Sequence, residues 1–198
     1  MAAPDLFDRL RDATGKGAPS SDFDLAPDLR PKDRALRAAA VLVGVEDGPR
    51  GMRLYLTKRS SGLKHHPGQI AFPGGKIDAG DADAQAAALR EAWEEIGLPA
   101  GAVEVLGTLA PHETVTGFNV TPVVGRITQP FTPMPEAGEV EDVFTVPFDH
   151  IADPANYIVE SRFFRGVRRQ FYTVPYGPYY IWGATARILR GLADRLAE

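Results

Sequence analysis

The chain of 198 residues contains no cysteine. This absence excludes disulfide bonds, thiolate metal sites and cysteine nucleophiles, and it is compatible with a reducing cytosol. No run approaches the roughly 18 consecutive apolar residues of a membrane-spanning helix. Residues 1–12 also lack the basic and then apolar pattern of a secretory signal. We therefore expect a cytoplasmic location and no membrane partner.

Neither sign of charge dominates the sequence, because the formal net charge is only −4 at pH 7. Such a balance does not indicate a nucleic-acid-binding surface, so we expect no nucleic acid partner. A polyanionic small-molecule substrate would have to be held by a local cluster of basic residues or by a metal ion. The sequence leaves the oligomeric state open.

The chain lacks internal repeats and any linker that would divide it into domains. Its length suits one domain with a substantial core. Residues 5–12 have the pattern of a short helix, and residues 13–34 are rich in Gly, Pro, Ser and Asp. We expect residues 1–35 to form an N-terminal arm, either packed or trailing, and residues 36–198 to form a single domain.

Hydrophobic periodicity predicts strands on both sides of a central helix, and a second long helix near the C-terminus. A hairpin is expected at residues 36–58, the central helix at 81–97 and the terminal helix at 179–196. Further elements are expected as strands at 103–109, 120–127 and 143–146, a short helix at 148–152, and a hairpin that pairs 157–163 with 167–174. This order of elements predicts an α/β fold, an α/β/α sandwich with a mixed sheet.

The central helix follows two adjacent glycines, Gly74 and Gly75, which let the backbone turn sharply and approach a ligand. Asp81 is a suitable N-cap for this helix, and Gly97 supplies a stop signal at its other end. One apolar stripe is expected from residues at helical spacing, namely Leu89, Ala92, Trp93 and Ile96.

Three glutamates, Glu91, Glu94 and Glu95, share the face nearly opposite that stripe. Acidic residues on a helix usually form a solvated face. Two features favour a metal site instead. Glu91 and Glu95 form a like-charged pair one turn apart, and no lysine in the next turn offsets their repulsion. The glycine loop also precedes them in the sequence. Only Arg90 reaches one of these acids, Glu94, at helical spacing. Three convergent carboxylates suit a hard divalent cation, which prefers oxygen ligands.

This loop and helix resemble the Nudix box, the loop–helix–loop signature of diphosphate hydrolases. The matching positions are Gly75, Arg90, Glu91, Glu94, Glu95, Ile96 and Gly97. The chain departs from the usual box because Asp81 stands where a glutamate is usual, and because eight residues, 82–89, precede the arginine instead of seven. Both departures resemble those of one subgroup, the coenzyme A pyrophosphatases.

Segments outside the box resemble the same subgroup. The adjoining residues 56–60 and 63–69 are similar to its own motif in order and spacing, and residues 116–125 and 181–186 are similar as well. The resemblance covers about residues 36–190 and implies the Nudix fold for this part of the chain.

The densest basic patch before the central helix is residues 58–66, KRSSGLKHH. Loops are commonly polar, so a solvated loop is one interpretation of this patch and phosphate binding is the other. Arg59 suits a bidentate contact and Lys64 a point-charge contact. Its two adjacent histidines are not expected to share a metal ion. The resemblance associates this patch with the coenzyme A part of the substrate, and it implies as substrate-binding residues Arg59, Lys64, His66, Gly74 and Gly75.

The resemblance also implies a reaction, hydrolysis of the diphosphate of coenzyme A or its derivatives to 3′,5′-ADP and 4′-phosphopantetheine or its acyl form. Mg²⁺ or Mn²⁺ would neutralise the diphosphate and activate water. The implied metal ligands are Glu91, Glu94, Glu95 and the carbonyl group of Gly75, with Arg90 orienting the glutamates. One of these carboxylates or Glu139, the acid before a valine in the subgroup's pattern, would accept the proton, and Glu113 is its rival.

Two other functions stay open. A Nudix hydrolase that acts on ADP-ribose or a related nucleoside diphosphate would share the metal helix and differ in residues 58–69. A non-catalytic nucleotide-binding module would have lost turnover, and Asp81 with its shifted spacing is the only hint of this. Near the C-terminus, Tyr179, Tyr180 and Trp182 are expected to belong to the core and not to a platform that stacks on a base.

Overall fold

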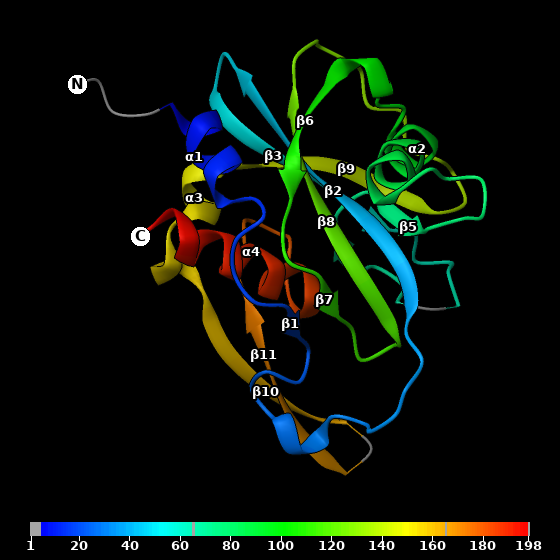
Figure 1. Cartoon of the computed structure of the whole chain (residues 1–198), viewed down its shortest axis with the longest axis vertical. Helices are drawn as coiled ribbons and strands as arrows, with labels where there is room; N and C mark the ends of the chain where they lie inside the picture. The colour runs from blue at the N-terminus through cyan, green and yellow to red at the C-terminus, as the bar shows by residue number, and fades with distance from the viewer. Residues whose placement is uncertain (1–4, 65, 165, 198) are drawn as a thin grey trace.

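Strand β2 (Arg37–Gly48) lies at the centre of the fold in the computed structural model (Figure 1). The structure describes residues 5–64, 66–164 and 166–197. The apolar run of β2 suits a strand that is covered on both faces. It pairs in parallel with β8 (Phe118–Ile127) and antiparallel with β3 (Gly51–Arg59), so the expected hairpin at residues 36–58 is confirmed. This hairpin pairs only near its turn, and at its open end β5 (Gly74–Lys76) takes the place beside β2.

The described residues form a nine-stranded sheet around β2 and β3. Its remaining strands are β1 (Ser20–Ser21), β4 (Ile70–Ala71), β6 (Val103–Thr108), β7 (His112–Glu113) and β9 (Val140–Pro147). The pairs β2–β8 and β1–β7 are parallel and the other pairs are antiparallel, so the expected mixed sheet is confirmed.

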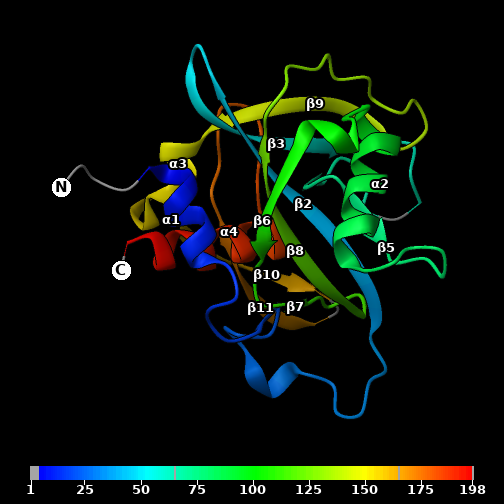
Figure 2. The same ribbon diagram turned by 45° about the horizontal axis from the view of Figure 1, so that its top comes forward.

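Helices cover both faces of this sheet (Figures 1 and 2). The helices are α1 (Leu6–Ala13), α2 (Ala84–Ile96), α3 (Phe148–Ala152) and α4 (Gly183–Leu196). Neighbouring residues of β2 point to different cores: Leu42 packs in the cluster with α2, and Val43 in the cluster with the other three helices. Alternation along the strand thus gives the expected α/β/α sandwich two cores.

Three local expectations about the helices are wrong. Helix α2 is capped by Asp83, whose side chain accepts a hydrogen bond from the Ala86 N–H, and not by Asp81. Trp93 is 53% exposed and lies outside the apolar stripe, because small side chains already fill the contact of α2 with the sheet. Helix α4 begins at Gly183 and not at residue 179.

The N-terminal segment packs on the body. Phe7 and Leu10 of α1 are buried in the same core as Leu189 of α4. Farther along, β1 extends the sheet by pairing with β7, and a 3₁₀ turn, η1 (Pro27–Leu29), follows.

A second hairpin of two strands stands apart from the large sheet. It consists of β10 (Ile158–Phe164) and β11 (Val167–Thr173), close to the residues expected for it. Two further 3₁₀ turns are η2 (Ala100–Ala102) and η3 (Pro154–Asn156). Within the part of the chain that the structure describes, no helix is long and apolar enough to cross a membrane.

Candidate active site

The glycine loop meets helix α2 through backbone that only glycine can supply. Gly74 has a φ of +155°, and a Cβ atom on it would lie 2.5 Å from the carbonyl oxygen of Ala40 in β2. In this conformation the Gly74 N–H donates a hydrogen bond of 3.1 Å to Oε2 of Glu95. The close approach of β5 to β2 therefore aims a backbone donor at a box glutamate.

Gly75 serves a different glutamate. A Cβ atom on Gly75 would lie 2.5 Å from Oε1 and 2.6 Å from Oε2 of Glu91. The Glu91 carboxylate therefore rests directly over the Cα atom of Gly75. The missing Cβ of Gly74 thus leaves room for the backbone of β2, and that of Gly75 leaves room for a carboxylate.

Glu95 is a buried carboxylate, only 5% exposed. Burial, with smaller contributions from the charges of Glu91 and Glu139, raises its pKa to about 7, against the lowering effect of the Gly74 hydrogen bond and the Arg59 charge. Burial likewise raises the pKa of Glu91, with Arg90 opposing this and Glu94 and Glu139 adding to it. These carboxylates thus lie close enough to repel one another, which leaves surplus negative charge at one spot.

Arg90 holds the glutamates from behind. Its Nη1 lies 3.0 Å from Oε1 of Glu91 and 2.9 Å from Oε2 of Glu94, whose side chain is half exposed. On its other edge, Nε and Nη2 make a bidentate contact with Asp81 at 3.0 and 2.9 Å. This geometry agrees with the orienting position expected of Arg90.

Asp81 has a position that the sequence did not suggest. Hydrogen bonds from Arg90 and from the Asp78 N–H lower the pKa of its nearly buried carboxyl group. Asp81 therefore anchors the arginine and does not cap the helix. The signal available in the sequence was Arg90 itself, because a guanidinium group has five donors and the box glutamates satisfy only one edge of it.

Glu139 is brought to the glutamates by the loop before β9. The Glu136 N–H donates to the Glu95 carbonyl oxygen at 2.9 Å, and the Ser60 N–H donates to the Glu139 carbonyl oxygen at 2.8 Å. The charge of Glu139 consequently acts on Glu91 and Glu95.

Glu113 is held elsewhere. Its buried carboxylate forms ion pairs with Arg30 and Arg34, the second at 3.3 Å. Both arginines come from the N-terminal segment. Of the two rival acids, the structure therefore brings Glu139 and not Glu113 to the box.

The residues of the basic patch differ in their distance from the glutamates: Arg59 acts on Glu95, whereas Lys64 and His66 lie on an exposed loop. Arg59 ends β3, and its Nε is buried without a hydrogen-bond partner while its charge lowers the pKa of Glu95. Lys64 and His66 are exposed on the loop that follows, where His66 has a φ of +54°. The expectation that the two adjacent histidines do not share a metal ion concerns position 65 as well, which lies outside the described residues.

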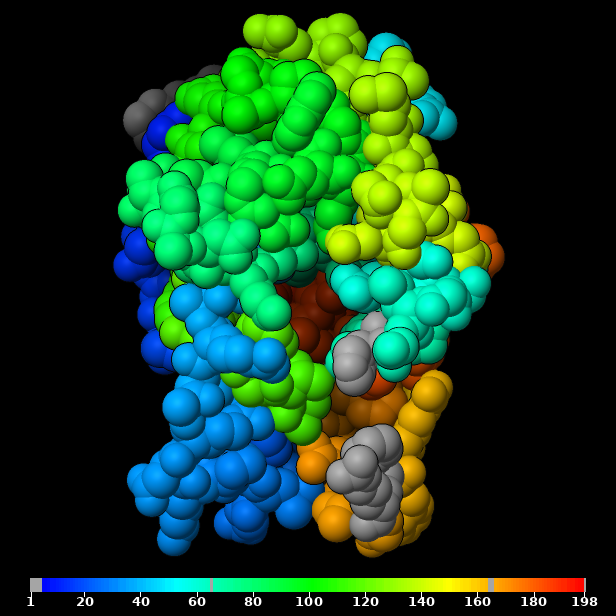
Figure 3. All heavy atoms as spheres, turned by 90° about the vertical axis from the view of Figure 1, so that its right-hand side faces the viewer, coloured from blue at the N-terminus to red at the C-terminus, as the bar shows by residue number. Residues whose placement is uncertain are grey.

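Figure 3 shows a hollow on this face of the molecule. The loop after β3 (cyan), the segment before α2 (blue-green) and the loop before β9 (yellow) form its rim, and C-terminal residues (dark red) form its floor. The start of α4 is tied to this region, because the Thr185 hydroxyl donates to the Ile70 carbonyl oxygen at 3.1 Å. The loop that carries the basic patch and the two segments that flank the box glutamates therefore border one hollow.

The C-terminal aromatic residues are all partly buried but differ in what they pack against. Tyr179 stacks on Phe144 at the edge of the core, as expected. Tyr180 and Trp182 are not packed against either core of the described residues: Tyr180 donates to Oε2 of Glu160 at 2.9 Å, and Trp182 makes an edge contact with Phe171. The expectation that all three lie in the core is therefore wrong for these two.

The donor set fits a hard divalent cation. Glu91, Glu94, Glu95 and the Gly75 carbonyl group offer oxygen atoms only, which Mg²⁺ and Mn²⁺ prefer. Their surplus negative charge also needs a counterion. Among the described residues, no three His, Asp or Glu side chains are arranged to hold a metal ion as they stand. The Gly74 N–H and Arg90 bind one oxygen of each carboxylate, so the second oxygens of Glu91, Glu94 and Glu95 would have to converge for a metal ion to bind.

Comparison with known proteins identifies the family. The model of the NUDIX domain matches residues 35–166. The chain belongs to the Nudix family. It is 43% identical over 169 residues to a protein of Salmonella dublin described as "Uncharacterized Nudix hydrolase NudL", covering 85% of this chain and 88% of that one. The protein of the same description from Escherichia coli is 42% identical over the same length, with the same coverage. This Nudix chain is accordingly a hydrolase of a diphosphate compound.

Solved structures agree on the fold. The Nudix hydrolase RenU of M. smegmatis is 28% identical, with a TM-score of 0.50 over 60% of this chain and 74% of that one. A MutT/nudix family protein of Enterococcus faecalis is 14% identical and has a TM-score of 0.52, covering 100% of this chain and 76% of its own. At that identity the second likeness concerns the fold alone. The expected Nudix fold is confirmed.

Proposed function

We propose that this Nudix hydrolase cleaves the diphosphate of coenzyme A or a derivative, releasing 3′,5′-ADP and 4′-phosphopantetheine or its acyl form. The observation that carries the proposal is the position of Arg59, which belongs to the segment resembling the coenzyme A subgroup and lies beside Glu95. Its buried Nε has no hydrogen-bond partner. Buried donors are normally satisfied, so an unused guanidinium donor next to the carboxylates supports a site for a phosphate group.

Glu91, Glu94, Glu95 and the Gly75 carbonyl group would hold Mg²⁺ or Mn²⁺. When bound, the ion would neutralise the diphosphate and lower the pKa of attacking water. Arg90, anchored on Asp81, would hold one oxygen of Glu91 and one of Glu94 while the second oxygen of each faces the ion. Glu139, exposed on its loop and not paired with a cation among the described residues, would accept the proton of the water.

Substrate recognition would fall to the end of β3 and its loop. Arg59 would bind a phosphate of the substrate bidentately from the end of β3. Lys64 and His66 would approach from the exposed rim, Lys64 as a point charge and His66 as a hydrogen-bond donor. Gly74 and Gly75 would let the diphosphate approach the backbone of the loop, as Gly75 already lets the Glu91 carboxylate approach.

Chromatographic product analysis tests the reaction. Coenzyme A and ADP-ribose are offered in parallel with Mg²⁺ or Mn²⁺. Appearance of 3′,5′-ADP from coenzyme A, with slow or no release of AMP from ADP-ribose, is the expected result. Preferential cleavage of ADP-ribose would keep the Nudix chemistry and refute the interpretation of residues 58–69. Absence of turnover with both would contradict the proposal and favour a non-catalytic binding module.

Substitution of Lys64 tests specificity for the 3′-phosphate. We expect Lys64→Ala to raise KM about tenfold for coenzyme A and far less for dephospho-coenzyme A, because only the first carries this phosphate. Arg50→Ala, at the exposed turn of the β2–β3 hairpin, serves as the control for loss of a surface cation. Steady-state kinetics on both substrates measures the ratio. Equal effects on the two substrates would remove Lys64 from 3′-phosphate recognition.

A further inference from the structure

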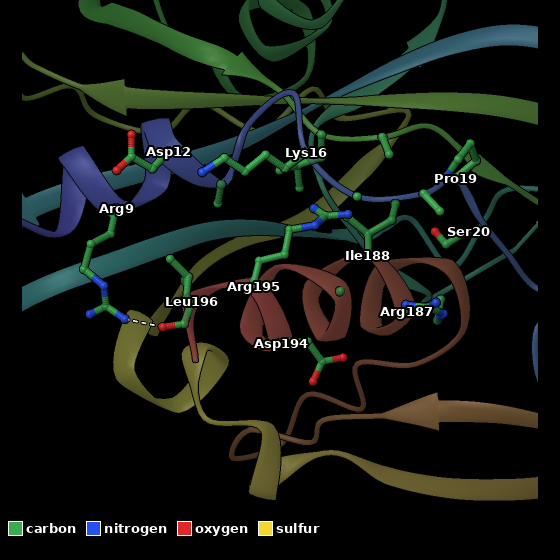
Figure 4. A pocket seen from close by; sticks show the side chains of 16 residues that line it. Arg9, Asp12, Lys16, Pro19, Ser20, Arg187, Ile188, Asp194, Arg195 and Leu196 are labelled. Atoms are coloured by element: carbon green, nitrogen blue, oxygen red, sulfur yellow. Dashed lines mark hydrogen bonds between the residues drawn. The ribbon is translucent and has the colours of Figure 1, made fainter. Parts of the chain in front are cut away.

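A cavity of about 550 Å³ lies between helices α1 and α4 and the segment that follows α1 (Figure 4). This volume falls in the range of about 300–1,000 Å³ that is usual for small-molecule sites. Side chains of Lys16 and Arg195 enter it from opposite walls, and Arg9 lies near its end, where it donates to the Leu196 carbonyl oxygen. None of its lining residues belongs to the glycine loop, to α2 or to the loop after β3.

The cavity is built from parts of the chain outside the family domain. The NUDIX model matches residues 35–166, whereas the cavity is lined by residues within 9–20 and 187–196, with only Leu109 and Ala110 from the matched region. Two segments far apart in the sequence thus meet here on the other side of the sheet from α2 (Figure 1). A ligand of this cavity would therefore be separate from the substrate of the box.

The charge of the lining favours an anion. Four cationic side chains line the cavity against two carboxylates, in a chain whose net charge is −4. One of these cations, Arg187, already forms an ion pair with Asp24 at 2.7 Å. One of the lining carboxylates, Asp194, already forms an ion pair with Arg190 at 2.8 Å. Lys16 has no hydrogen bond or ion pair among the described residues. Its ammonium group is thus available to a ligand from solution.

Gly17 leaves room for the guanidinium group of Arg195, the cation on the opposite wall from Lys16. It has a φ of +86°, and a Cβ atom on it would lie 2.7 Å from both Nε and Nη2 of Arg195. The guanidinium group therefore rests against the backbone of Gly17, at the wall of the cavity. Any larger residue at position 17 would displace the arginine side chain from this place, because its Cβ atom would overlap the guanidinium group.

Apolar side chains complete the lining. Ala13, Leu109, Ile188 and Leu196 are buried in the core and present their edges to the cavity. A ligand that fills the space would meet cations at its head and hydrocarbon along its body. We propose that this cavity is a second binding site, for a small organic anion with a phosphate or carboxylate head and a short apolar chain.

Hexyl phosphate is the probe that combines these features, with inorganic phosphate and 1-hexanol as its two halves. A ¹H–¹⁵N NMR titration of the full chain reports the site residue by residue and needs no turnover. We expect saturable shifts of amides in residues 16–20 and 187–196 with hexyl phosphate, and binding at least tenfold weaker with either half, since each half loses one kind of contact. The readout is independent of hydrolysis, so failure here does not touch the proposed function.

Charge and shape are then tested separately. Lys16→Glu should weaken binding at least tenfold, whereas Lys32→Glu, the same reversal at an exposed lysine outside the cavity, should change it less than twofold. Ala18→Trp, which adds bulk to the lining without changing charge, should also abolish the shifts. Unchanged affinity in Lys16→Glu and Ala18→Trp would overturn the site. So would the absence of saturable shifts in these segments at about 1 mM, the weak end of small-ligand affinity.

Discussion

Glu95 is nearly buried, yet the metal ligand that we propose it to be must be ionised. Its pKa of about 7 lies above the ordinary value of a glutamate, so the folded metal-free protein holds a proton that the unfolded chain has released. Stability of the metal-free protein therefore falls as pH rises from about 4.5 to 7, and the full cost, a few kcal/mol, is present above pH 7. The residue is retained at the expense of stability, which is typical of functional sites.

Replacement of Glu95 by glutamine separates these two properties. Glutamine keeps an acceptor for the Gly74 N–H but carries no charge, so Glu95→Gln should lower kcat at least 100-fold, by analogy with other lost charged groups in active sites. The thermal midpoint of metal-free Glu95→Gln at pH 8 should equal or exceed that of the wild type, because the buried charge is gone. Calorimetry and steady-state kinetics measure the two effects. Near-normal turnover in this folded variant would refute the ligand assignment.

Metal affinity should depend on pH for the same reason. With Glu95 as the proposed ligand, the ion would have to displace its proton, so the apparent affinity should fall as pH drops through about 7, the pKa of this group. Release of one proton predicts Mn²⁺ binding about tenfold weaker at pH 6 than at pH 8, and the raised pKa of Glu91 acts in the same direction. Electron paramagnetic resonance of free Mn²⁺ gives the affinities. A constant affinity across this range would mean that Glu95 is not a ligand.

At the scale of elements, the two glycines of the loop should respond differently to the same substitution. In Gly74→Ala the new methyl group meets the backbone of β2 at a φ that alanine rarely adopts, so we expect a loss of at least about 2 kcal/mol of stability. In Gly75→Ala the methyl group meets only the flexible end of Glu91, which it displaces. That variant should stay folded, within about 1 kcal/mol of the wild type, and lose Mn²⁺ affinity.

Denaturant unfolding and Mn²⁺ titration distinguish the pair. Gly80→Ala, at a loop glycine with open space around it, is the matched control and should change neither quantity. Equal loss of stability in both loop variants would show that Glu91 is not held over Gly75 as the structure has it. A Gly75→Ala variant with full metal affinity would show that the position of Glu91 does not matter for the ion.

Local patterns predicted most of these elements, and long-range contacts decided the rest. The hairpins, the central helix and its Gly97 end follow from periodicity and turn residues, which depend on near neighbours in the chain. The start of α2 was not predictable in this way, because Asp81 and Asp83 are both suitable caps. The choice between them depends on Arg90, which binds the Asp81 carboxylate and leaves Asp83 to cap the helix. Trp93 was misplaced because periodicity does not reveal that alanines suffice for a close helix–sheet contact.

The candidate site shows the same division. Glycine and glutamate spacing was sufficient to propose the box, whereas the choice between Glu139 and Glu113 depended on which loop returns to α2 and which acid the N-terminal segment neutralises. Neither contact leaves a local pattern. The partial exposure of Tyr180 and Trp182 is likewise a consequence of where the β10–β11 hairpin lies.

At the scale of the whole molecule, two helices outside residues 35–166, the part that matches the NUDIX model, pack on one face of its sheet. They are α1, which precedes this part, and α4, which follows it. The α2 face carries the box, and the opposite face carries α4 with α1 packed beside it (Figure 2). The core on the α4 face is therefore completed by residues of α1. The cavity between α1 and α4 exists only because these two helices meet, so its integrity depends on that packing.

The packing of α1 predicts that the N-terminal segment is needed for stability. Leu10 is fully buried in the same core as Leu192, so Leu10→Ala should cost about 2–5 kcal/mol, as large-to-small changes in cores do. Leu36→Ala removes the same atoms from a side chain that is 36% exposed just before β2, and it should cost less than about 0.5 kcal/mol. Urea unfolding gives both values. A Leu10→Ala variant as stable as Leu36→Ala would mean that α1 is a detachable arm, and the cavity between α1 and α4 would then lack a rigid wall.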